Sequence, residues 1–421
     1  MEKILNSGYG AIFGTYWMIY AVISSFASVF LLAKGYTNSQ IGVTLAVANV
    51  LAVIMQPLIA DFVDRREKPG VIGTTEIMTI CMMIFTVGMF AFKGGTAALC
   101  IVFVLLIAFH TVLQPLFNSL AFRLEKCGVP INFGIARAVG SLAYSIFVAI
   151  LGTLVQNHGV IVMPITAEIT CLLLLASLIF TGRQFNRAMQ HKNATFVPGY
   201  IVAKDATFQP GTNVASEQIT LVQFIRRNKW FFVVNLGVLG LFFSNAILNN
   251  YMAQIVTAVG GTTKDMGGIL SLMAFLEIPT MVFFKRLKNR FSVQLLLKVA
   301  AIGFTVKIAM CWLGQSVLML YLAHVLQLVS FALFLPGMVY FTDEMMEKGE
   351  AVKGQALYTT MITITTIFSS LIGGWILDVA GAKTLTFIAT LATAVGAAVV
   401  IYAIDKVKSN KKGVENVRGI N

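Results

Sequence analysis

The chain has 421 residues, of which 57% are hydrophobic and only 12% charged, and its formal net charge is +13. This composition excludes an ordinary soluble domain, in which about 25% of residues are charged. A membrane-spanning helix needs about 20 mostly apolar residues, and the sequence contains twelve such stretches. In chain order they are residues 10–34, 39–63, 70–92, 96–124, 131–156, 159–182, 230–257, 266–284, 291–313, 317–341, 355–379 and 384–404. The sequence therefore predicts an all-α membrane protein with twelve transmembrane helices.

One long polar segment, residues 183–229, separates the first six stretches from the last six. We therefore expect an N-terminal six-helix bundle (1–182), a cytoplasmic central loop (183–229), a C-terminal six-helix bundle (230–404) and a cytoplasmic tail (405–421). Two six-helix halves are typical of a large class of secondary transporters, whose solute site lies between the halves near the bilayer midplane.

The positive charge follows the predicted loops. If the N-terminus is cytoplasmic, most Lys and Arg residues fall in loops and tails on that side, and only Lys34, Lys93, Lys264 and Lys383 fall in loops on the other. Cytoplasmic loops carry such an excess, which predicts a multi-pass protein of the cell (inner) membrane with both termini in the cytoplasm. Because topology accounts for the charge, the expected partner is the lipid bilayer, and no nucleic acid is expected.

The cysteines lack the spacing of metal ligands. We expect them to pack as small apolar side chains, and we predict no metal and no cofactor. No phosphate-binding loop pattern is present, which disfavours a nucleotide-driven pump. The cysteines are Cys81, Cys100, Cys127, Cys171 and Cys311.

Acidic and basic residues meet after the second stretch, where Asp61, Asp64 and Arg65 precede further charged residues. Two interpretations are open. The group is a solvated turn of the positive-inside type, or it is a conformational latch in which Asp64 binds neighbouring helix ends in only one of two conformations.

Residues 37–65, which include this turn, resemble the corresponding part of the oligosaccharide:proton symporter family, to which the lactose permease belongs, in the major facilitator superfamily. The similarity continues in residues 133–140 (FGIARAVG) and around His324. The resemblance implies the major facilitator fold, alternating access, a functional monomer and a small-molecule solute transported with protons.

On the fourth stretch, His110, Gln114 and Asn118 recur every four residues and so share one helix face. Such a polar face either joins helices by hydrogen bonds or lines a cavity. The resembled family carries a carboxylate in this region, whereas this chain has Asn118, Ser119 or Leu120 there.

On the fifth stretch, the resemblance makes Arg137 the counterpart of a sugar-binding arginine and Tyr144 the counterpart of an aromatic ring that stacks on sugar. A forked guanidinium can hold two neighbouring hydroxyls in one plane, which suits a pyranose. The alternative is that Arg137 extends to the cytoplasmic surface.

The seventh stretch carries Asn245 and Asn249, four residues apart on one face, where the resembled family has acidic residues. Amides both donate and accept hydrogen bonds. The two asparagines are therefore predicted solute ligands, unless they only bridge helices.

Glu277, Lys307 and His324 lie in the middle of three consecutive apolar stretches. A charge at the centre of a membrane helix costs about 2.5–3.5 kcal/mol on insertion scales, so such residues usually have partners or line a polar path. The resemblance places Lys307 at an arginine, His324 at a histidine and Gln327 at the glutamate that carries the proton. Glu277 lies two positions from the family's essential acid.

Glu277 is accordingly the expected proton carrier, because burial favours a protonated carboxyl and a nearby cation favours an ionised one. The alternative is a static Glu277–Lys307 pair that only fixes helix packing.

The prediction for function is a secondary transporter of a small polar solute, a sugar or oligosaccharide, coupled to protons. A nucleoside or aromatic-acid importer and a drug exporter stay open as alternatives. A membrane enzyme or sensor is disfavoured, because no paired nucleophile and base appears at helical spacing.

Overall fold

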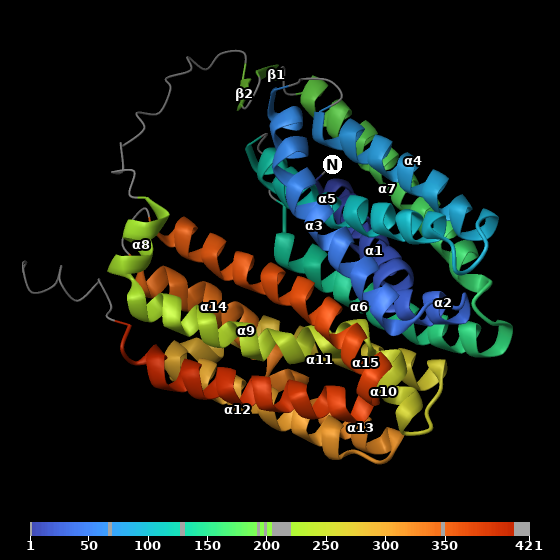
Figure 1. Cartoon of the computed structure of the whole chain (residues 1–421). Helices are drawn as coiled ribbons and strands as arrows, with labels where there is room; N and C mark the ends of the chain where they lie inside the picture. The colour runs from blue at the N-terminus through green and yellow to red at the C-terminus, as the bar shows by residue number, and fades with distance from the viewer. Residues whose placement is uncertain are drawn as a thin grey trace, which may run out of the picture. The chain divides into compact units, whose positions relative to one another are not determined.

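The computed structural model describes residues 2–65, 70–126, 131–191, 194–197, 200–203, 220–346 and 350–407. Most of these residues are helical, and Figure 1 follows them from the N-terminus in blue to the C-terminus in red. Cys127, much of the predicted central loop and nearly all of the predicted tail lie outside the described residues.

The elements alternate helices with short connections. In chain order they are α1 (Glu2–Tyr20), the π-helix η1 (Ala21–Ser25), α2 (Ala27–Ala33), α3 (Asn38–Arg65), α4 (Gly70–Ala91), α5 (Ala97–Lys126), α6 (Phe133–His158), α7 (Val162–His191), the strands β1 (Ala194–Val197) and β2 (Tyr200–Ala203), α8 (Leu221–Arg227), α9 (Lys229–Asn250), α10 (Met252–Ala258), α11 (Thr263–Arg290), α12 (Val293–Leu313), α13 (Val317–Val325), the 3-10 helix η2 (Leu326–Val329), α14 (Phe331–Met345) and α15 (Ala351–Ile404). The two strands pair antiparallel, with Ala194 opposite Ala203.

Two compact units divide the chain. Unit 1 comprises Met1–Gly211 and Thr262–Ala274, and unit 2 comprises Thr212–Gly261 and Phe275–Asn421. In unit 1, α1 packs on α6 and α7, and α4 packs on α5 and α7. In unit 2, α9 runs along α15, and α12 packs on both α14 and α15.

The helices follow from the apolar stretches, because backbone groups in hydrocarbon must be satisfied within their own segment. Polar residues mark several starts. The side chains of Asn132, Ser292 and Ser316 each cap a helix by accepting the backbone N–H three residues later, which satisfies one of the donors left over in the first turn.

Among the described residues, ten helices are long and apolar enough to span a membrane, or eleven when Glu2–Ser25 and Ala27–Ala33, bent by 40°, count as one span. The predicted fold class, a membrane protein built from spanning helices, is confirmed, and the short pair β1–β2 lies outside these spans. α15 covers the last two predicted spans, 355–379 and 384–404. Its one non-helical residue, Gly381, has φ of 77° and lies in the predicted connection between these spans. α7 continues to His191, beyond the predicted end at residue 182.

Three of the predicted spans are broken inside the apolar region. The first changes to η1 after Tyr20, the seventh breaks at Tyr251 between α9 and α10, and the tenth is interrupted by η2 and Ser330. None of these breaks lies at a proline or glycine. Irregular backbone at membrane depth is tolerated where protein buries it or where it lines a polar cavity.

Glycines bring α9 and the last part of α15 into backbone contact within unit 2. A Cβ at Gly237 would lie 2.8 Å from the carbonyl oxygen of Gly396, and one at Gly396 would lie 2.6 Å from that of Gly237. Gly240 faces the backbone of Ala392 and Gly396 in the same way. Small residues at membrane helix interfaces allow such close approach.

We predict that Gly240→Ala destabilises the protein by about 1–3 kcal/mol, because the added methyl group meets backbone that cannot move aside as a side chain would. Thermal unfolding in detergent measures the effect. Gly134→Ala is the matched control, since a Cβ there meets nothing closer than 3.6 Å and replacing a helical glycine by alanine normally stabilises. Equal unfolding midpoints for the two variants would contradict the close packing of α9 on α15.

Candidate functional site

A chain of hydrogen bonds joins three polar side chains inside unit 2. The Lys307 Nζ donates to Gln327 Oε1 at 2.9 Å, and the Gln327 Nε2 donates to Glu277 Oε1 at 2.9 Å. Lys307 is fully buried and Gln327 is 1% exposed. The structure thus brings together three of the four predicted coupling residues, with the amide between the two ionisable groups.

The direction of these bonds fixes the orientation of the amide. An ammonium group only donates and an ionised carboxylate only accepts. Gln327 therefore turns its oxygen to Lys307 and its nitrogen to Glu277. It connects the cation and the acid for which a static pair was the alternative interpretation of the sequence.

Gln327 lies in η2, the break between α13 and α14, and neighbouring elements hold this break. The Thr280 hydroxyl of α11 donates to the Leu328 carbonyl at 3.2 Å, and the Ser330 hydroxyl donates to the Leu326 carbonyl at 2.7 Å. α12 approaches the same backbone, because a Cβ at Gly303 would lie 2.7 Å from the Val329 carbonyl oxygen. The Leu326 and Leu328 carbonyls at the break therefore accept hydrogen bonds from side chains.

His324 lies in α13, about one turn before Gln327, and is fully buried. Its Nδ1 lies 2.7 Å from the Leu320 carbonyl. A carbonyl only accepts, so Nδ1 carries the ring proton. The buried Nε2 has no hydrogen-bond partner among the described residues.

The asparagines of the predicted seventh span lie at the end of α9, just before the break at Tyr251. Asn249 Nδ2 donates to the Asn245 carbonyl at 2.9 Å, so this amide bonds within its own helix. Asn245 is 7% exposed, and its Oδ1 has no partner among the described residues. Asn250 reaches across to α15, where its Nδ2 lies 3.0 Å from the Ser370 hydroxyl.

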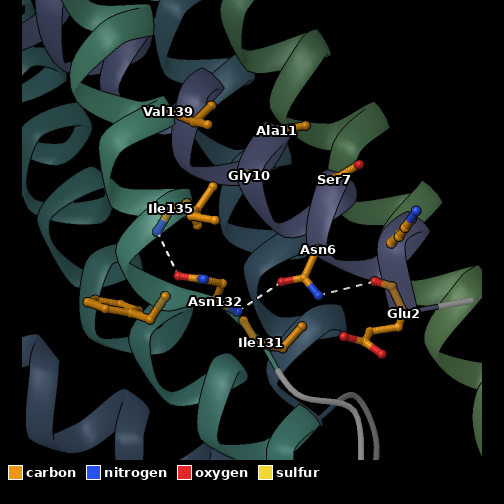
Figure 2. A pocket seen from close by; sticks show the side chains of 12 residues that line it. Glu2, Asn6, Ser7, Gly10, Ala11, Ile131, Asn132, Ile135 and Val139 are labelled. Carbon is orange, nitrogen blue, oxygen red and sulfur yellow. Dashed lines mark hydrogen bonds between the residues drawn. The ribbon is translucent and has the colours of Figure 1, made fainter.

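In unit 1, a cavity of about 900 Å³ opens between the first turns of α1 and the start of α6 (Figure 2). Asn6 and Asn132 join the two helices there, since the Asn132 backbone N–H donates to Asn6 Oδ1 at 2.9 Å. Gly10 and Ala11 leave room on α1, while Ile135 and Val139 line the α6 side. The charge pattern predicts this end of both helices to be cytoplasmic.

Arg137 and Tyr144 follow along α6, beyond this cavity. The Arg137 Nη1 donates to the Ser141 hydroxyl at 2.6 Å, and its Cζ lies 4.4 Å from the centroid of the Trp17 ring of α1. The Tyr144 hydroxyl lies 2.9 Å from the Ser25 hydroxyl of η1. Arg137 is half-buried and lies against α1.

The predicted polar face of the fourth stretch lies on α5. His110 is 1% exposed, and its ring stacks on Tyr16 with centroids 4.1 Å apart and planes 8° from parallel. Its Nε2 lies 3.0 Å from the Tyr16 carbonyl, so the histidine packs α5 onto α1. Gln114 and Asn118 are half-buried on the same helix.

The predicted latch residues lie at the end of α3. Arg65 Nε and Asp61 Oδ1 form an ion pair at 2.7 Å between exposed side chains. Exposed pairs of this kind contribute about 0.2–1 kcal/mol. The role of Asp61, Asp64 and Arg65 as a latch stays a prediction.

Residues that sequence reasoning missed include Trp17, Thr280 and Ser141. Trp17 belongs to a run of aromatic residues at helical spacing, Tyr9, Phe13, Trp17 and Tyr20, which could have marked this face of α1. The other two are ordinary small polar residues, and nothing in the sequence distinguishes them.

A comparison with family models decides the identity of the fold. Residues 9–389 match the model of the MFS_1 like family, which is nearly the whole chain. The chain belongs to the MFS_1 like family. It is therefore a multi-pass membrane transporter of the major facilitator kind, and the resemblance to that superfamily is confirmed.

Similar proteins of this MFS type agree with the assignment. The chain is 24% identical to a maltose permease of Geobacillus stearothermophilus over 373 residues, which covers 85% of this chain and 86% of the permease. It is also 24% identical to a probable 3-phenylpropionic acid transporter of Escherichia coli (strain K12), covering 84% and 88%.

Solved structures show the same MFS fold. The nucleoside transporter NupG matches with a TM-score of 0.74 at 16% identity, covering 96% of this chain and 100% of that one. An inward-facing bacterial homologue of the iron transporter ferroportin matches with a TM-score of 0.67 at 14% identity, covering 96% and 98%.

We predict that Lys307 and Gln327 are energetically coupled. Lys307→Met and Gln327→Leu should each destabilise, because each leaves a buried polar partner unsatisfied. The loss in free energy of unfolding in the double variant should be smaller than the sum of the two single losses by about 1–3 kcal/mol. Unfolding in detergent completes the cycle.

The pair of Lys298 and Asp405, 2.5 Å apart and with side chains 26% and 60% exposed, is the matched control for this cycle. Lys298→Met and Asp405→Asn should show a coupling below about 1 kcal/mol. Additive losses at Lys307 and Gln327 would mean that their hydrogen bond does not contribute to stability.

Proposed function

We propose that the protein is a proton-coupled secondary transporter that moves a small polar solute, with sugars and oligosaccharides as the first candidates. The observation that carries this proposal is the buried chain from Lys307 through Gln327 to Glu277, located at a break in a membrane helix. Ionisable groups inside a membrane bundle mark ion and proton paths.

Glu277 is the group that changes its protonation in this proposal. Ionised, it accepts from the Gln327 amide, and the ammonium of Lys307 favours its charge through that amide. Protonated, Glu277 is a weaker acceptor, so its hydrogen bond with the Gln327 amide weakens. Gln327, and with it the break at η2, can then move more freely. Proton binding to Glu277 is thereby linked to the geometry of α11, α12 and η2.

Arg137 and the cavity at the start of α6 support a solute path in unit 1. A guanidinium binds neighbouring hydroxyls or a carboxylate with two parallel hydrogen bonds. The maltose permease relative favours a sugar. Asn245 and Asn249 in unit 2, and Gln114 and Asn118 in unit 1, are proposed as further ligands.

A second solute class has support from a specific observation. Tyr16, Trp17, Tyr20 and Tyr144 form a group of rings in unit 1, with Trp17 contacting the other three. Aromatic side chains suit any solute with a flat ring or an apolar face. An aromatic carboxylate or a nucleoside, as the names of the 3-phenylpropionic acid transporter and NupG suggest, is therefore the alternative.

We propose further that the protein acts as a monomer in the cell (inner) membrane, with both termini in the cytoplasm. The placement of Lys and Arg supports this orientation.

We predict that Glu277→Gln abolishes solute accumulation driven by a pH gradient while exchange without a gradient stays measurable. The amide copies the size of the carboxyl but cannot take up a proton. Uptake into energised vesicles and exchange in de-energised vesicles measure the two activities. Glu168→Gln is the control, because Glu168 accepts a hydrogen bond from Thr86 in unit 1 and its amide can do the same. Normal accumulation by Glu277→Gln would remove Glu277 from coupling.

We predict that Arg137→Lys raises the KM for the solute about tenfold or more, since an ammonium cannot form the paired hydrogen bonds of a guanidinium. The measurement uses radiolabelled maltose, uridine and 3-phenylpropionate in vesicles, which also separates the solute classes. Arg187→Lys, an exposed substitution in α7, is the control. An unchanged KM for Arg137→Lys would support the view that Arg137 only extends to the surface.

A further inference from the structure

The position of Arg137 depends on Trp17. The Arg137 Cζ lies 4.4 Å from the centroid of the Trp17 ring, within the ~6 Å at which a cation is attracted to an aromatic face. The two residues come from α1 and α6, which pack along each other in unit 1.

Gly140 sets the place of the indole. A Cβ at Gly140 would lie 2.5 Å from Trp17 Cδ1, 3.2 Å from Trp17 Nε1 and 3.3 Å from the Phe13 carbonyl oxygen. Any other residue at position 140 would therefore push the indole away from α6. Since Arg137 is three residues earlier on the same helix, this push would separate the ring from the guanidinium.

Neighbouring rings hold the indole on its other sides. Its centroid lies 5.3 Å from that of Tyr20 and 6.4 Å from that of Tyr144, with planes at 68° and 85°. These are edge-to-face contacts of favourable geometry. Tyr144 is itself fixed by its hydroxyl, which lies 2.9 Å from that of Ser25.

No hydrogen bond within the described residues anchors the indole. Its Nε1 is buried and has no partner there. The ring is therefore placed by Gly140, by the neighbouring rings and by the cation above its face. Removing the cation or filling the space at Gly140 should move it.

An indole holds a guanidinium differently from a carboxylate. A carboxylate accepts two of the five N–H groups, which lie in the guanidinium plane, whereas a ring face takes up none of them. An arginine held by its face can still donate hydrogen bonds in its own plane, as Arg137 does to the Ser141 hydroxyl at 2.6 Å.

We propose that Trp17 is a positioning residue for solute binding, which orients the Arg137 guanidinium through its indole face, and that Gly140 fixes the orientation of Trp17. This inference rests on the proposed function only where it takes Arg137 as a solute ligand. The geometric part can be tested without any solute.

The kinetic test measures downhill entry, without a gradient, of whichever of radiolabelled maltose, uridine and 3-phenylpropionate the wild-type protein transports. Trp17→Leu and Gly140→Ala should each raise the KM about three- to tenfold, with the maximal rate within about threefold of wild type, as expected for a lost cation–π contact. Trp17→Phe, which keeps a weaker aromatic face, should lie between Trp17→Leu and wild type.

Two matched controls accompany these variants. Trp375→Leu removes a tryptophan that is 61% exposed in α15, and Gly134→Ala adds a methyl group on α6 where the nearest atom is 3.6 Å away. Both should keep the wild-type KM. Because entry is downhill, a failure of proton coupling at Glu277 would leave this comparison unaffected.

The spectroscopic test needs no transport. With Trp230, Trp312 and Trp375 replaced by Phe, the emission of Trp17 should shift when Arg137→Gln removes the cation, and again when Gly140→Ala moves the ring. Gly134→Ala should leave it unchanged.

An unchanged KM for Trp17→Leu, or a loss of maximal rate alone, would overturn the proposal, as would an emission of Trp17 that does not respond to Arg137→Gln. If none of the three solutes enters, the emission result decides alone.

Discussion

The burial of an ammonium group inside a membrane helix bundle is the constraint on which unit 2 depends. Lys307 is fully buried, and the desolvation of such a charge is costly unless hydrogen bonds replace its water. Gln327 supplies one, and it can do so because α13 ends before it and η2 carries it towards α12. The break, in turn, requires donors for its carbonyls, which Thr280 and Ser330 provide. One buried charge thus connects α11, α12 and the broken tenth span.

Unit 1 also holds a cation within its helices, but an aromatic ring takes the place of the hydrogen-bonded chain. Its Arg137 lies on the indole of Trp17 and donates to Ser141. A guanidinium over an aromatic face still donates in its own plane, here to Ser141, whereas the ammonium of Lys307 donates to an amide that also binds the ionisable Glu277. The two arrangements suit the two tasks that we propose, solute binding in unit 1 and proton coupling in unit 2.

The sequence predicted the spans well because bilayer thickness dictates their length. Each of α3, α4, α5 and α12 contains nearly all of its predicted stretch, and Gly381 marks the expected connection inside α15. The breaks at η1, Tyr251 and η2 were not predictable from local signals, since they contain no proline or glycine. They depend on contacts with neighbouring helices. In η2, for example, the Val329 backbone packs against Gly303 of α12.

For the candidate site, the sequence predicted several of the residues but not how they are arranged. Glu277, Lys307 and His324 stood out as ionisable residues in apolar stretches, and the family resemblance added Gln327. The order in space, with the Gln327 amide between Lys307 and Glu277, required the fold. Trp17 was missed because the aromatic run to which it belongs marks a face of α1 but does not show that this face contacts Arg137. His110 was expected beside a solute or a helix, and its stacking on Tyr16 shows how it joins α5 to α1.

In the proposed mechanism, solute and proton cross the membrane together. It is tested most directly by adding the transported solute to de-energised proteoliposomes that contain a pH-sensitive dye. Solute entry should acidify the interior of vesicles with the wild-type protein, whereas solute should enter vesicles with Glu277→Gln without this acidification. Solute entry through the wild-type protein with no change in internal pH would contradict proton coupling.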